Sequence, residues 1–136
     1  MRNLIKLEKW WQDENLLELD LYAQSEQICL KSRYYVSIDS ICLLNEHLVS
    51  LLDNEINNFC WESGDSSRQD YALIPQTPRL GLKIVRIDKK GHIKIEVDAE
   101  INDGEEDTYH KCNFNIYLDT YEVIEFVHNI KQLMIF

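Results

Sequence analysis

His110 and Cys112 come nearest, of all residues in this sequence, to the types and spacing of a metal site. On a strand, residues i and i+2 point to the same side, so this imidazole and thiol could reach one zinc ion. A structural zinc site needs four ligands, and the spacing of the remaining cysteines and histidines supplies no third and fourth. We therefore interpret the pair as a hydrogen-bonded histidine and a core thiol. We predict no metal site and no cofactor.

The remaining reactive side chains form no catalytic motif. The sequence lacks a G-x-S-x-G nucleophile elbow, a Gly-rich phosphate loop and an H-E-x-x-H helix. The carboxylate-rich residues 98–107 do not fit a calcium loop, because counting back from Gly104 places Ala99 at the first ligand position. We therefore name no catalytic residue and expect a protein that is not an enzyme. A small metal-binding protein or enzyme that uses His110 and Cys112 stays as an alternative.

An acidic run offers a better candidate for function, as a binding surface. From Glu96 to Asp107, seven of twelve residues are acidic and none is basic. Such a patch would speed association with a basic partner, although a solvated sheet face that only keeps the chain soluble would look the same. The predicted partner-binding residues are Glu96, Asp98, Glu100, Asp103, Glu105, Glu106, Asp107 and Tyr109.

The overall charge points to the same class of partner. The chain carries 24 Asp and Glu against 14 Lys and Arg, a net charge of -10. A surface this negative repels phosphate backbones and anionic lipid heads, so we expect no nucleic-acid partner and no membrane partner. The four cysteines show no close pairing, and no signal peptide or apolar span is evident. We therefore expect a cytoplasmic protein.

Local patterns predict one α+β domain over residues 1–136, a length that can bury its own core. Apolar alternation indicates strands, and capping residues followed by apolar residues at helical spacing indicate two helices. The strands are expected at 3–11, 16–23, 27–36, 80–88, 92–101 and 108–118, with a further short one at 56–61; the helices begin at Ser37 or Asp39 and at Asp119.

These elements are expected to form one curved antiparallel sheet of about six strands with two helices on one face, in βββα-βββα order. Residues 62–79, which contain Pro75 and Pro78, are expected to form a long irregular loop. Trp10 and Trp11 are adjacent on a predicted strand, so we expect one to enter the core and the other to lie exposed or under the long loop. A homo-oligomeric structural or regulatory domain, assembled through a sheet edge, is a further alternative.

The second half of the chain resembles small bacterial immunity proteins, which neutralise the toxin domains of contact-dependent and related polymorphic toxin systems. The resemblance covers about residues 80–134 and is carried by LKIV at 82–85, GHIKIEV at 91–97, FNIYLDTY at 114–121 and the closing helix. It is one of layout and hydrophobic pattern. It implies a protein that binds a cognate toxin domain and blocks its active site, and an acidic surface would suit a toxin with a basic cleft.

Overall fold

The computed structural model describes residues 2–63, 78–102 and 109–135. It confirms an α+β fold with antiparallel strands and two helices. Most of the loop predicted at 62–79 lies outside the described residues. In chain order the elements are β1 (Leu4–Gln12), β2 (Leu16–Gln24), β3 (Cys29–Ser37), α1 (Ile38–Leu52), β4 (Asn58–Glu62), β5 (Leu80–Arg86), β6 (Ile93–Asn102), β7 (Tyr109–Leu118) and α2 (Thr120–Leu133).

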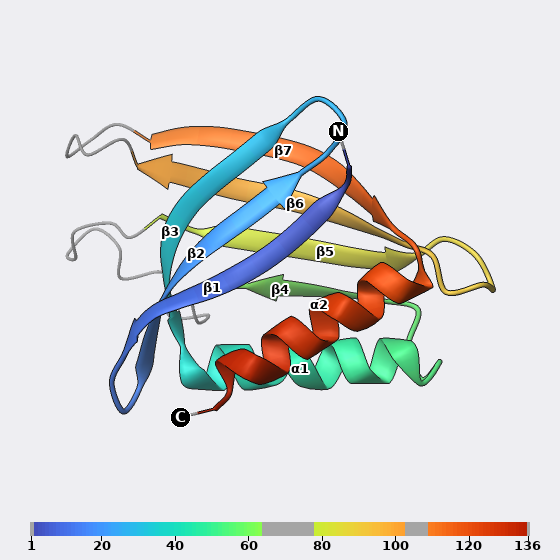
Figure 1. The fold of residues 1–136 in the computed structure, drawn as a ribbon, viewed down its shortest axis with the longest axis horizontal. Coiled ribbons are helices and arrows are strands. Elements are labelled where there is room, and N and C mark those ends of the chain that lie inside the picture. The colour runs from blue at the N-terminus through green and yellow to red at the C-terminus, as the bar shows by residue number, and fades with distance from the viewer. Residues whose placement is uncertain (1, 64–77, 103–108, 136) are drawn as a thin grey trace.

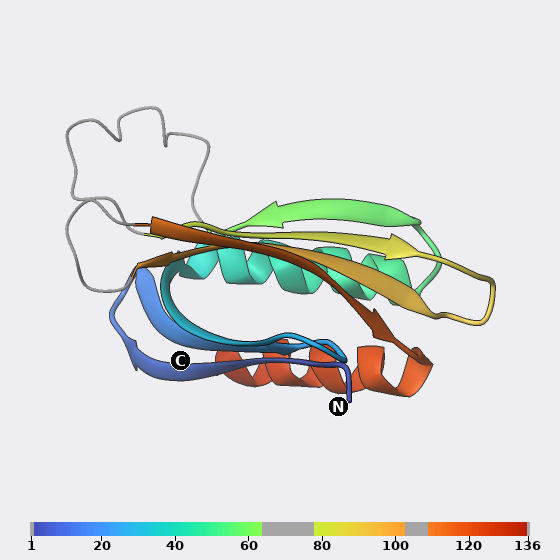
Figure 2. The same cartoon turned by 90° about the horizontal axis from the view of Figure 1, so that it is seen from above.

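The strands form two sheets where the sequence suggested one. β1, β2 and β3 make a three-stranded sheet, and β4, β5, β6 and β7 make a four-stranded sheet, each in sequential order. The two sheets face each other and cross at an angle (Figures 1 and 2). The break falls between β3 and β4, which α1 separates in the chain, so no tight hairpin turn enforces their pairing.

Both helices begin where their capping residues predict. The Ser37 side chain accepts a hydrogen bond from the Ser40 N–H at the start of α1, and Asp119 with Glu122 forms a capping box at the start of α2. The helices lie side by side along one edge of the two sheets (Figure 1). Neither helix is long and apolar enough to cross a membrane.

The core fills the space between the sheets and the helices. Alternate residues of the strands and one stripe of each helix are buried in it. Tyr34 on β3 is fully buried, and its hydroxyl donates a hydrogen bond of 3.0 Å to the backbone carbonyl of Glu100 on β6. This bond links the two sheets across the core. Burial raises the pKa of Tyr34 to about 12.

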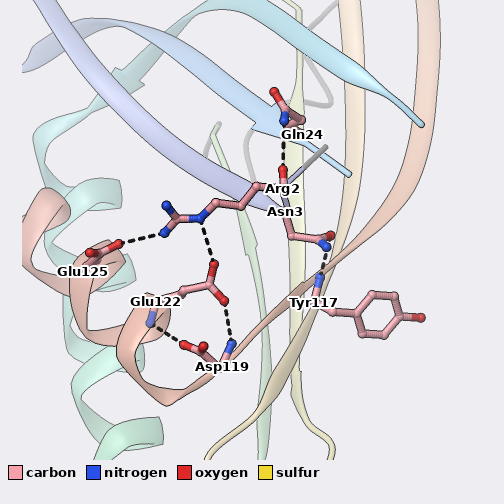
Figure 3. Close-up of polar contacts among 7 residues, drawn as sticks. All are labelled: Arg2, Asn3, Gln24, Tyr117, Asp119, Glu122 and Glu125. Atoms are coloured by element: carbon pink, nitrogen blue, oxygen red, sulfur yellow. Dashed lines mark hydrogen bonds and ion pairs between the residues drawn. The ribbon is translucent and has the colours of Figure 1, made fainter. Parts of the chain in front are cut away.

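The N-terminal residues connect both sheets to α2 (Figure 3). Arg2 forms ion pairs with Glu122 and Glu125 on α2. The side-chain oxygen of Asn3 accepts a hydrogen bond of 3.2 Å from the backbone N–H of Tyr117 on β7. The side-chain amide of Gln24 donates one of 2.9 Å to the carbonyl of Arg2.

The outer edge of β1 is covered by α2. The side-chain oxygen of Asn129 accepts a hydrogen bond of 2.9 Å from the Leu7 N–H, and its amide nitrogen donates one of 2.8 Å to the Leu7 carbonyl. One side chain therefore satisfies both backbone groups of an edge-strand residue.

Candidate functional site

The outer face of the four-stranded sheet carries part of the predicted acidic patch. Glu96, Asp98 and Glu100 alternate with buried residues of β6, so all three lie on that face. Two further parts of the prediction, residues 103–107 and the side chain of Tyr109, lie outside what the structure describes. The partner-binding role of this patch stays a prediction.

Basic residues from outside the acidic run reach these carboxylates. Arg79, just before β5, lies 2.9 Å from Asp98 and 2.5 Å from Glu62 through its guanidinium nitrogens. Its backbone N–H also donates a hydrogen bond of 2.8 Å to the side chain of Glu100. Lys83 on β5 pairs with Glu96 at 3.8 Å. The strand that looks purely acidic in sequence is therefore partly neutralised by its neighbours.

The absence of a side chain at Gly81 leaves room for the Arg79 guanidinium on the sheet face. Gly81 pairs with Asp98 on one side and with Glu62 on the other. A Cβ atom added at Gly81 would lie 2.8 Å from a terminal nitrogen of Arg79. The guanidinium thus lies over a position without a side chain, between two carboxylates on neighbouring strands.

The outer face of the three-stranded sheet carries an aromatic cluster that the sequence did not predict. The register of β1 against β2 shifts between Lys9 and Trp11, which leaves Trp10 as an extra residue in a β-bulge. Trp11 then pairs with Glu18 on the outer face, and Trp10 and Trp11 are 57% and 50% exposed. The expectation that one of them enters the core is wrong, because the bulge changes the alternation at this point.

A buried carboxylate holds this cluster in place. Asp20 on β2 is 3% exposed, although its strand position faces outward. It accepts hydrogen bonds of 2.6 Å from the Trp10 indole N–H and 3.0 Å from the Nε of Arg33 on β3. Burial raises the pKa of Asp20, but the hydrogen bonds from Arg33 and Trp10 together with the positive charges of Arg33 and Lys31 lower it by more, so its pKa lies below the ordinary value.

The side chains around Asp20 form a continuous surface. The Arg33 guanidinium lies 4.6 Å from the centre of the Trp10 ring, a cation–π contact, and 3.2 Å from Glu18. Tyr35 on β3 is exposed and pairs with Glu18, whose hydrogen bond raises the pKa of the Tyr35 phenol. We call this surface the aromatic platform. It comprises Trp10, Trp11, Glu18, Asp20, Arg33 and Tyr35.

His110 and Cys112 share one face of β7 by strand parity, as expected. Cys112 is half-buried against the core and His110 is exposed. Within the described part of the chain, no group of three or more His, Cys, Asp or Glu residues is arranged to hold a metal ion.

Comparison with known proteins finds little. No family model matches the chain, and no curated protein matches it. Among solved structures, the plant transcriptional regulator PBF-2 is similar, with a TM-score of 0.48 and 10% sequence identity over 97% of this chain and 71% of that chain. A similarity at this level carries no inference about function, so the site is interpreted from its own geometry.

Proposed function

We propose that this chain is a cytoplasmic protein-binding domain of the immunity type, which binds a cognate toxin domain and blocks its active site. The observation that carries the proposal is the aromatic platform. It places Trp10, Trp11, Arg33 and Tyr35 together and exposed on one sheet face. Trp, Tyr and Arg are the residues that most often dominate the binding energy of protein interfaces.

The platform is also ordered before any partner arrives. Asp20 fixes the Trp10 indole by one hydrogen bond and the Arg33 guanidinium by two, of 3.0 and 3.4 Å. Side chains that are already fixed lose less conformational freedom on binding, so more of the contact energy appears as affinity. This supports a binding role over a merely exposed aromatic pair.

The acidic residues of β6 fit a second, weaker role in the same proposal. Asp98 is half exposed even though it pairs with Arg79, so its charge still reaches solvent. Exposed charges mainly raise the association rate with an oppositely charged partner, whereas buried aromatic contacts mainly slow dissociation. We therefore expect the two faces to affect different rate constants.

The test takes the purified product of the gene adjacent to this chain's gene as the candidate toxin domain and measures association and dissociation rates by surface plasmon resonance. The Trp10→Ala, Trp11→Ala double variant should weaken binding by about a thousandfold, mainly through faster dissociation, because two hot-spot residues contribute about 2 kcal/mol each. Neutralising Glu96, Asp98 and Glu100 together should instead slow association several-fold, and added salt should remove that difference.

Tyr121→Ala is the matched control, because Tyr121 is an exposed aromatic residue on α2, away from both faces. It should leave both rate constants unchanged. A double tryptophan variant with wild-type dissociation would remove the platform from the interface. Absence of any complex between the wild-type chain and the toxin domain at low salt would overturn the immunity role.

A further inference from the structure

A cavity of about 170 Å³ lies where the β5–β6 turn meets the end of α1 and the start of α2. The turn and the two helix ends come together at the same end of the molecule (Figures 1 and 2). Three basic residues line the cavity, Arg86, Lys89 and Lys90, together with Thr120 from the first turn of α2.

The charge around this cavity is opposite to that of the chain as a whole. Residues 83–94 contain five Lys and Arg and one acidic residue, Asp88, in a protein of net charge -10. Asp88 is engaged within the turn: its side chain accepts hydrogen bonds from the backbone N–H groups of Lys90 and His92, and it pairs with the His92 ring. The carboxylates at the start of α2, Asp119 and Glu122, are engaged in the capping box.

The turn is fixed against α2, so the basic residues have a defined position. The Thr120 hydroxyl donates a hydrogen bond of 2.5 Å to the Lys90 carbonyl. Gly91 has a φ of 91°, and a Cβ atom there would lie 2.7 Å from the Thr120 hydroxyl oxygen. A residue with a side chain at position 91 would therefore push the turn away from the helix.

Arg86 supplies a donor that the protein does not use. One terminal nitrogen of Arg86 donates to the Leu51 carbonyl at the end of α1. Its Nε is buried and has no hydrogen-bond partner among the described residues. The bond to Leu51 holds the Arg86 guanidinium, a permanent positive charge, at the wall of the cavity.

We propose that this cavity binds a tetrahedral oxyanion of the phosphate class. Arg86, Lys89 and Lys90 provide the positive charge that attracts the anion. The volume lies below the range of about 300–1,000 Å³ that is usual for drug-sized ligands, which suits a small anion or the phosphate end of a larger molecule. The site is separate from the aromatic platform and does not depend on the proposed toxin partner.

The test is an NMR titration of the full chain with inorganic phosphate, with sodium chloride at matched ionic strength as the reference. Saturable shifts of the backbone amides of Lys90, Gly91, Thr120 and Tyr121, seen with phosphate alone, are the expected result. The Lys89→Gln, Lys90→Gln double variant should weaken binding by roughly tenfold, because it removes two cations near a dianion. A parallel titration with phenyl phosphate separates the sources: tighter binding there than for inorganic phosphate supports the site with a phosphoester as its ligand.

The matched control is the Lys83→Gln, Lys94→Gln double variant. These lysines belong to the same charged segment and change the net charge equally, but they lie on the outer face of the sheet. This control should bind phosphate within about twofold of the wild-type affinity. Equal weakening in both double variants, or shifts that chloride reproduces at the same ionic strength, would overturn the proposal.

Discussion

The outer faces of the two sheets each carry an Arg–Asp pair, but they bury opposite partners. On the three-stranded sheet the Asp20 side chain is 4% exposed and the Arg33 side chain 45%. On the four-stranded sheet Asp98 is 51% exposed and Arg79 25%. The first face therefore presents a cation with aromatic rings, and the second presents carboxylates. What each surface offers to a partner depends on which member of its ion pair is buried. The number of charges alone does not determine it.

Removing the charge of the buried Asp20 carboxylate should cause the largest loss of stability. Asp20→Asn should lower the free energy of unfolding by about 2 kcal/mol, since hydrogen bonds to a charged group contribute about 1.5–3 kcal/mol each and an amide keeps part of them. Asp98→Asn, its counterpart on the four-stranded sheet, should cost under about 1 kcal/mol because that carboxylate is exposed. Urea unfolding at pH 7 measures both. Equal losses would contradict the contrast between the faces.

The contribution of Asp20 should depend on pH in a defined direction. Its folded-state pKa is lowered, so the stability it adds is fully present above the unfolded value of about 3.9 and is lost as pH falls through the folded value. The gap between wild type and Asp20→Asn should therefore shrink as the urea series is taken below about pH 4. A gap that stays constant down to pH 2 would show that Asp20 does not act as a carboxylate here.

Removing the hydrogen bond from Tyr34 to Glu100, which links the two sheets, should cause the next largest loss of stability. Tyr34→Phe should cost about 1 kcal/mol, because it removes one hydrogen bond and leaves the Glu100 carbonyl without the Tyr34 hydroxyl. The pKa of Tyr34 is raised to about 12, so its neutral form adds stability below about pH 10 that is lost as pH rises through 12. Thermal unfolding between pH 9 and 12 should show a steeper fall for wild type than for the variant. Identical slopes would contradict the pKa of Tyr34.

Removing the positive charge of Arg79 from the acidic face should change stability least. Arg79→Gln should cost under about 1 kcal/mol, because Glu62 and Asp98 are about half exposed. It should nevertheless increase the negative potential of the four-stranded face. With the toxin partner of the proposed function, its association rate should rise at low salt and match wild type at high salt, as stopped-flow mixing would measure. A slower association would mean that Arg79 itself contacts the partner.

The elements were predictable because their signals are local. Alternation along 92–101 and the capping residues Ser37 and Asp119 depend only on neighbours in the chain, and the structure places a strand and two helix starts there. The division into two sheets was not predictable in this way, because it depends on which strands pair after α1.

The residues that meet on the two outer sheet faces also depend on how the strands pair. The bulge at Trp10 exists only relative to β2, so alternation along β1 alone predicted the wrong side for one tryptophan. Arg79 lies 19 residues before its partner Asp98, and Lys83 lies 13 residues before its partner Glu96, so an acidic run read along one strand does not reveal these basic residues. The place of Arg33 in the aromatic platform could have been predicted only from its position opposite Asp20 in the pairing of β2 with β3.

The bidentate contact of Asn129 with β1 has a consequence for the behaviour of the protein at high concentration. An edge strand with unused backbone groups can recruit a strand of another molecule and start aggregation or fibril growth. Asn129 occupies both groups of Leu7 in the middle of β1, so an incoming strand would first have to displace α2. The helix therefore blocks pairing of β1 with a second molecule, and losing the Asn129 amide would leave the two Leu7 backbone groups without that partner while the core side chains stay in place.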